Sequence, residues 1–222
     1  MANETEEQQI AEIKKWWSEN ATSIIVGVVL GLAGVFGVRA WLGYQDSLAE
    51  RASTIYTVMM QGLEQGNPQL VSERADTLIT QYSSTPYAAM AALALAKIQL
   101  QEGDLDAANS QLKWVLDNGD VDVVRDTARL RLARVLIAQE RLDEAAALLE
   151  QPRSTTAFDN LYTEVAGDIH SARDNAAAAS EAYQRALAAT PATNQANPGY
   201  QLLQLKYENA LAASNVVNEV SQ

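Results

Sequence analysis

The N-terminal part of this chain contains an uncharged, apolar stretch that constrains the fold more than any other feature. No residue from Asn20 to Val38 is charged. A helix of that length rises about 28 Å, close to the thickness of the hydrocarbon core of a bilayer. Aromatic residues flank the stretch as they do at membrane surfaces, with Trp16 and Trp17 before it and Trp41 and Tyr44 after it. We therefore predict a transmembrane helix over residues 21–42.

A cleaved signal peptide or a buried core helix could also contain such a stretch. A signal peptide begins with a short basic segment and ends at a small-residue cleavage site. Here the first twenty residues carry five acidic residues against Lys14 and Lys15. The exit "GVRAWLGY" (37–44) lacks the A-x-A pattern. The sequence therefore favours an uncleaved anchor that crosses the membrane once.

The charges on the two sides of the predicted span are nearly balanced. Lys14 and Lys15 precede it, and Arg39 and Arg51 follow it. Because the two lysines are adjacent and close to the membrane, we expect a cytoplasmic N-terminus and an exported C-terminal part. The predicted organisation is a cytoplasmic segment (1–20), the transmembrane helix (21–42), a helical domain (43–213) and a C-terminal tail (214–222).

Three glycines lie on one side of the predicted span. Gly27, Gly31 and Gly34 stand at positions i, i+4 and i+7, and Gly37 lies at the edge of the same face. In lipid, small residues allow the backbones of two helices to approach closely. We therefore predict that this face docks against another membrane helix. The alternative is that glycine is simply more frequent in membrane helices than in soluble ones.

The residues after Leu42 are predicted to be all-α. Alanine and leucine dominate, and the alternation typical of strands is scarce. Turn-forming residues separate segments of helical length at 64–69, 83–87, 102–104, 117–122, 151–156 and 190–200. Short helices joined by tight turns indicate stacked helical hairpins.

An internal repeat supports this prediction. Segment 93–108 resembles segment 130–146 at an offset of 37 residues, and segment 165–191 follows at an offset of 34. The third unit places small, aromatic and proline residues at tetratricopeptide spacings: Gly167, Ala179, Tyr183, Ala186 and Pro191. The predicted fold is therefore a tetratricopeptide-like α-solenoid. Its ends are a diverged opening hairpin (47–86) and a capping helix (199–213).

The composition excludes several classes of protein. The formal net charge of −12 argues against a nucleic-acid-binding protein. The chain has no cysteine and one histidine, His170, so thiol catalysis and paired-histidine metal sites are excluded. The acidic segment 102–106 lies where a hairpin turn is expected, and the segment 117–122 lacks the twelve-residue calcium loop, so both are interpreted as solvated turns. We predict no enzyme activity, no metal and no cofactor.

A stack of helical hairpins offers a groove that binds segments of other proteins. Its wall comes mostly from the first helix of each hairpin. Candidate groove residues are Lys97, Gln101, Arg131, Arg134, Ala138 and His170. The cationic side chains among them could pair with acidic groups on a partner, or could be solvated only.

Several segments resemble the YfgM family of ancillary SecYEG translocon subunits. They are "IKKWWSEN" (13–20), "IVGVVLGLAGVFG" (25–37), "VRAW" (38–41), "AERASTIYT" (49–57), "LALAK" (93–97) and "LRLARV" (130–135). The resemblance extends from Lys14 to Leu211. It is most specific in the apolar block and in "LRLARV".

The resemblance implies a single-pass protein of the bacterial inner membrane with a cytoplasmic N-terminus and a periplasmic C-terminal domain. The implied partners are the lipid bilayer, the SecYEG translocon, the membrane-anchored periplasmic chaperone PpiD and nascent exported proteins. The family has no known catalytic residues. Related periplasmic tetratricopeptide proteins act in assembly or coordination of envelope or cytochrome machinery, which is the alternative function. A structural homo-oligomer held by the span is a third hypothesis.

Overall fold

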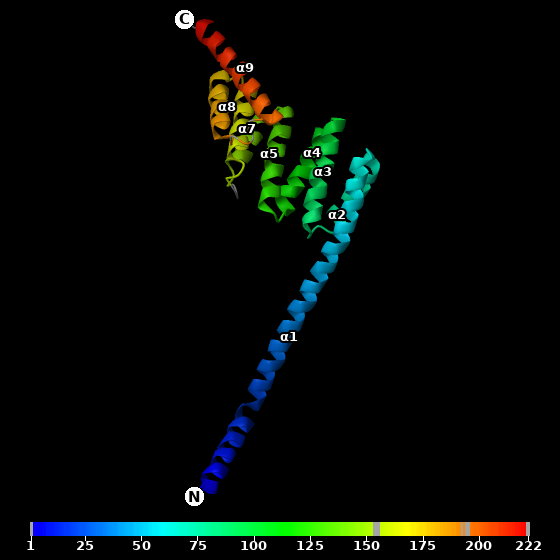
Figure 1. The fold of residues 1–222 in the computed structure, drawn as a ribbon, viewed down its shortest axis with the longest axis vertical. Coiled ribbons are helices and arrows are strands. Elements are labelled where there is room, and N and C mark those ends of the chain that lie inside the picture. Colours follow the sequence, from blue (N-terminus) through cyan, green and yellow to red (C-terminus); the bar gives the residue numbers. More distant parts are fainter. Residues whose placement is uncertain (1, 153–155, 192, 194–195, 221–222) are drawn as a thin grey trace. The chain divides into compact units, whose positions relative to one another are not determined.

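The computed structural model describes residues 2–152, 156–191, 193 and 196–220, and these residues form helices and turns without β-strands (Figure 1). The α-helices are α1 (Ala2–Glu64), α2 (Pro68–Gln81), α3 (Pro86–Glu102), α4 (Leu105–Asn118), α5 (Asp122–Ala138), α6 (Leu142–Glu150), α7 (Asp159–Ala172), α8 (Ala176–Ala189) and α9 (Pro198–Val220). The predicted all-α class, with an apolar N-terminal helix followed by hairpins, is confirmed.

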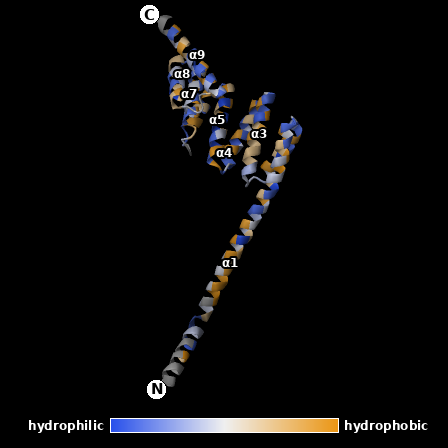
Figure 2. Ribbon diagram, viewed as in Figure 1, coloured by the Kyte–Doolittle hydropathy of each residue, from blue (hydrophilic) through white to orange (hydrophobic). Residues whose placement is uncertain are grey.

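The chain divides into two compact units, Met1–Glu50 and Arg51–Gln222. The first unit is part of α1, which is long and apolar enough to cross a membrane. Figure 2 shows the apolar residues of this helix. Large side chains such as Leu30 and Phe36 are about two-thirds exposed, so this segment is not a core helix of the described structure. Helix α1 continues without a break beyond both ends of the predicted span, so no helix end marks its limits. The limits 21–42 therefore remain a prediction.

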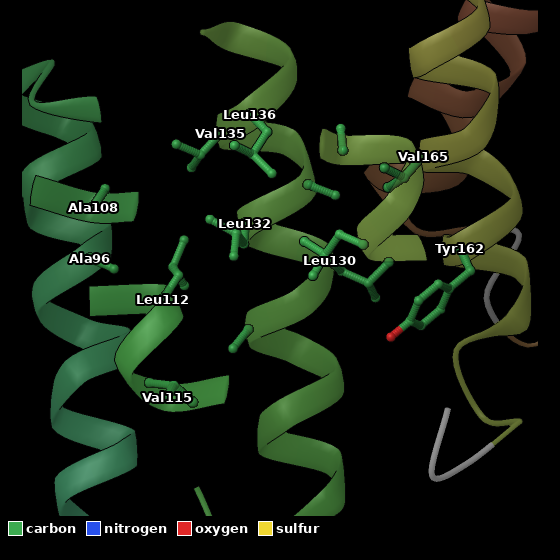
Figure 3. Close-up of a cluster of buried hydrophobic side chains, with 14 of the residues drawn as sticks. Ala96, Ala108, Leu112, Val115, Leu130, Leu132, Val135, Leu136, Tyr162 and Val165 are labelled. Atoms are coloured by element: carbon green, nitrogen blue, oxygen red, sulfur yellow. The ribbon is translucent and has the colours of Figure 1, made fainter. Parts of the chain in front are cut away.

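The second unit is an array of helical hairpins. The last part of α1 (51–64) packs with α2 and α3 around a cluster that includes Met59, Val71 and Leu95. A larger cluster joins α3, α4, α5, α6 and α7, and Figure 3 shows its central side chains. A third cluster joins α8 to α9 through Tyr183 and Leu203. The opening hairpin and the capping helix therefore cover the two ends of the array, as predicted.

The turns inside the hairpins confirm the repeat alignment. Gly103, Glu140 and Asp174 are separated by the same offsets of 37 and 34 residues and have φ angles of 83°, 59° and 57°. The residues that follow include two helix N-caps, because Asp104 and Asn175 accept hydrogen bonds from the backbone N–H groups of Ala107 and Ala178. The predicted breaks did not include the turns at Glu140 and Asp174, because neither turn contains glycine or proline.

Replacing Glu140 with glycine is expected to stabilise the second unit. A non-glycine residue in the left-handed region is strained by about 1–2 kcal/mol, part of which is offset by the greater freedom of glycine in the unfolded chain. The expected gain is about 1 kcal/mol, or roughly 2–4 °C in Tm for a domain of this size. Thermal unfolding followed by circular dichroism measures it. Glu140→Ala is the control, and an equal gain in that variant would show that the side chain, not the backbone, is responsible.

The small residues at the tetratricopeptide positions are buried where helices pack against each other. Ala96, Ala133 and Gly167 are equivalent positions, and so are Ala108, Ala145 and Ala179; all six are buried. A Cβ atom added to Gly167 would lie 2.6 Å from Cε1 of Tyr183. Helix α8 ends at Ala189, two residues before Pro191, as predicted.

Candidate interaction surface

The first helices of the hairpins form a continuous layer. Helix α5 contacts α3 on one side and α7 on the other. Four predicted groove residues are exposed on this layer: Lys97 and Gln101 on α3, and Arg131 and Arg134 on α5. Ala138 is exposed as well, and His170 is half-buried on α7. We call the exposed side of α3 and α5 the first-helix face.

Two arginines of α5 extend toward the neighbouring helices of this layer. Nη1 of Arg131 lies 3.5 Å from the backbone oxygen of Leu93 on α3. Nη2 of Arg134 lies 3.9 Å from Oε2 of Glu164 on α7. Arg131 therefore lies where α5 contacts α3, and Arg134 lies where α5 contacts α7. Gln101 lies apart from them, in a notch of about 280 Å³ that Gly62 and Ile98 also line.

A larger cleft lies between α5, α7 and α9. Its volume is about 510 Å³, within the range of ligand-binding clefts. Apolar side chains from α7 and α9 line part of it, namely Leu161, Leu202 and Leu203. Its polar lining includes Arg134, Asn160, Glu164, Asp168 and Lys206. We call this the α7–α9 cleft.

A charged network forms the floor of the α7–α9 cleft. Nζ of Lys206 lies 2.7 Å from Oε1 of Glu164 and 2.8 Å from Oδ1 of Asp168. The hydroxyl of Tyr183 donates a hydrogen bond of 2.8 Å to Asp168 Oδ1. Lys206 therefore pairs with both carboxylates and ties α9 to α7. Residue spacing does not reveal this network, because 38 and 42 residues separate Lys206 from its two partners.

The pKa of Tyr183 is raised above its ordinary value. Burial is the main cause, and the charge of Asp168 and the hydrogen bond to it add to the effect. The folded state therefore favours the neutral hydroxyl. The contribution of this group to stability is complete below about pH 10, the ordinary pKa of tyrosine, and is lost as the pH rises above that value.

We expect the Tyr183→Phe variant to lose less stability than the unchanged protein between about pH 9 and 11, because it has no phenol to ionise. At neutral pH the variant should be slightly less stable, because Asp168 loses a donor. Urea unfolding across that pH range measures both effects. Tyr44→Phe, at an exposed position, is the control. Parallel pH profiles for Tyr183→Phe and the unchanged protein would contradict the assignment.

A second polar centre lies inside the array. Asp126 is fully buried, and its Oδ1 atom lies 2.9 Å from Nη1 of Arg129 and accepts a hydrogen bond of 3.2 Å from the Tyr162 hydroxyl. Arg129 also donates to the Tyr162 oxygen at 3.3 Å. Burial raises the pKa of Tyr162. This centre fixes α5 against α7 and leaves Arg129 unavailable to a partner.

The glycine face of the predicted span lies in open space. A Cβ atom added to Gly27, Gly31, Gly34 or Gly37 would meet no atom within 4 Å. In the described structure these glycines are not required by contacts within the chain. Docking of this face against another membrane helix remains a prediction.

Known proteins match almost the whole chain. The family model described as "Tetratricopeptide repeat-like domain" matches residues 14–213, which include the apolar stretch. A Haemophilus influenzae protein is 31% identical over 82% of this chain and 88% of its own length, and it is named an ancillary SecYEG translocon subunit. The chain belongs to the family of ancillary SecYEG translocon subunits. The predicted YfgM resemblance is thereby confirmed.

Other proteins named ancillary SecYEG translocon subunits also match the chain. The Aggregatibacter actinomycetemcomitans protein is 31% identical over 92% of this chain and 97% of its own length. The Escherichia coli protein is 29% identical over 66% of this chain and 70% of its own length. No solved structure matches the chain.

Proposed function

We propose that this protein is a non-catalytic interaction module that is anchored in the inner membrane and works beside the SecYEG translocon. The similarity to proteins named as translocon subunits, over most of the chain, carries the proposal. The exposed apolar segment of α1 supports anchorage, and the tetratricopeptide-like unit supports binding to other proteins. Anchorage raises the local concentration of the second unit near the channel, so that weak contacts become effective.

We further propose a cytoplasmic N-terminus and a periplasmic second unit, which assists exported proteins together with a membrane-anchored chaperone of the PpiD type. A reporter enzyme fused after Gln222, active only in the periplasm, tests the orientation. We expect activity from this fusion and none from a fusion to the N-terminus. The reverse pattern would overturn the proposed orientation.

Site-specific photo-crosslinking in cells tests the partners. A crosslinker at Leu32 is expected to capture channel subunits, and crosslinkers at Gln101 or Arg134 are expected to capture a periplasmic chaperone or an exported chain. Capture of this chain alone would contradict the proposal and favour a structural homo-oligomer. Capture of cytochrome or envelope assembly proteins in place of the channel would favour the alternative function.

The glycine face is our candidate for the contact with the channel. Gly27→Leu combined with Gly31→Leu should leave membrane insertion intact, because leucine is at least as apolar as glycine. It should lower recovery of the channel by about ten-fold, because two side chains block the close approach of the helices. Affinity purification from mild detergent measures recovery. The matched control, Val29→Leu with Phe36→Leu, alters the opposite face, and equal losses in both variants would exclude a specific docking face.

A further inference from the structure

We propose that the first-helix face and the adjoining α7–α9 cleft bind an extended, acidic segment of a partner protein that carries an apolar side chain. This inference rests on the proposed function and adds the chemical class of the segment that is bound.

The first observation is a local reversal of charge. The whole chain carries a formal net charge of −12. In contrast, residues 86–101 of α3 and 127–138 of α5 contain Lys97, Arg129, Arg131 and Arg134. The acidic residues of these two helices lie outside these segments, at Glu102, Asp122 and Asp126. Because acidic residues are frequent elsewhere in the chain, an acidic partner finds its favourable contacts on this face and repulsion over most of the remaining surface.

Three of these four cations are available to a partner. Arg129 is nine-tenths buried and is held by Asp126. Lys97 and Arg131 are exposed and form no ion pair within the described part of the chain. Arg134 is 42% exposed, and its nearest carboxylate, Glu164 at 3.9 Å, already pairs with Lys206 at 2.7 Å. Each arginine therefore keeps most of its five N–H donors for a ligand.

The positions of these cations suit an extended chain. Lys97 lies on α3, while Arg131 and Arg134 lie on α5 and reach toward α3 and α7 respectively. The axes of packed helices are about 8–10 Å apart, and an extended chain advances about 3.3 Å per residue. Acidic side chains about three residues apart can therefore meet cations on successive helices.

The α7–α9 cleft continues this surface beyond Arg134, which lines it. Leu202 is 53% exposed there, so its side chain is available to an apolar group of the ligand. Lys206 offsets one of the two negative charges on the floor and Arg134 offsets the other, so the cleft does not repel an acidic ligand strongly. The α7–α9 cleft therefore accepts an apolar side chain next to the acidic groups bound by the first-helix face.

Peptide binding to the full chain in nanodiscs of zwitterionic lipid tests the proposal. The probe is a fluorescent peptide of about twelve residues, with aspartate at roughly every third position and one leucine. Fluorescence anisotropy should show binding that weakens as salt is added. Replacing the aspartates with asparagine should weaken binding by about ten-fold or more, and replacing the leucine with serine should weaken it to a smaller extent.

Protein variants locate the site. Arg131→Gln combined with Arg134→Gln should weaken binding of the acidic peptide by about ten-fold, while Arg185→Gln should change it less than about two-fold. Arg185 is an exposed arginine on α8, the second helix of its hairpin, and is the matched control. Leu202→Ser should reduce the affinity for the leucine-containing peptide. It should leave the affinity for the peptide with serine in place of leucine unchanged. Circular dichroism checks that each variant is folded.

Three outcomes would overturn the proposal. They are equal binding of the asparagine peptide, equal loss in the Arg185→Gln variant, and self-association of the chain through this face in the absence of peptide. Peptide binding and crosslinking to the channel are separate measurements. If peptide binding fails while the crosslinks persist, the translocon-associated function stands and only this binding surface is rejected.

Discussion

The Asp126→Ala variant is expected to lose about 3–5 kcal/mol of unfolding free energy, because removing one partner of a buried ion pair leaves the other charge uncompensated. Asp126 is fully buried, and the Arg129 side chain is only 12% exposed. The variant also removes the acceptor of the Tyr162 hydroxyl, which joins α7 to α5. Urea unfolding of the full chain in detergent micelles, followed by circular dichroism, measures the loss.

The same helix provides the control. Asp122 lies one turn earlier on α5 and pairs with Arg125, but its side chain is 54% exposed. Exposed ion pairs contribute about 0–1 kcal/mol, so Asp122→Ala should change stability little. If the two alanine variants were equally stable, the buried centre would have no special role in joining α5 to α7.

Gly167→Ala is expected to destabilise the second unit by about 1–3 kcal/mol, the usual cost of overpacking. The added methyl group would lie 2.6 Å from the ring of Tyr183, which is 3% exposed and is held by Asp168. The ring cannot simply turn toward solvent. Alanine favours a helix more than glycine does, so a loss of stability would show that the steric contact outweighs helix propensity.

A second substitution should rescue this variant. In the other two units the equivalent positions hold alanine and leucine: Ala96 with Leu112, and Ala133 with Leu149. Gly167→Ala combined with Tyr183→Leu reproduces that pairing and is expected to be more stable than the sum of the two single effects predicts. The double-mutant cycle measures this coupling. Strict additivity would show that the two positions do not compensate each other.

The apolar helix and the repeat could be predicted because both are local patterns. An uncharged run long enough to span a bilayer needs no knowledge of the remaining fold. The offsets of 37 and 34 residues align Gly103, Glu140 and Asp174, all of which adopt positive φ angles. The hairpin turns at Glu140 and Asp174 were nevertheless absent from the predicted breaks. Their left-handed residues carry no glycine signal, and only their equivalence to Gly103 identifies them.

The candidate surface was predictable only in part. Lys97, Arg131 and Arg134 were predicted as residues of a groove, and the structure shows them exposed on the first helices of their hairpins. The predicted groove residues included Arg131 and left out Arg129, and in the structure Arg131 is exposed while Arg129 is paired with the buried Asp126. Two arginines two residues apart point to different sides of a helix, and only the position of the neighbouring helix decides which one is buried.

The amino-acid sequence by itself determined the all-α class, the apolar N-terminal helix and the repeat, because each depends on residue composition or spacing within one segment. The tertiary structure alone decided which charges are neutralised. Lys206 meets Glu164 and Asp168 only after α9 packs on the array, and the α7–α9 cleft exists only between helices that are distant in the chain. Ion pairs and clefts depend on distances across space, which residue spacing along the chain does not specify.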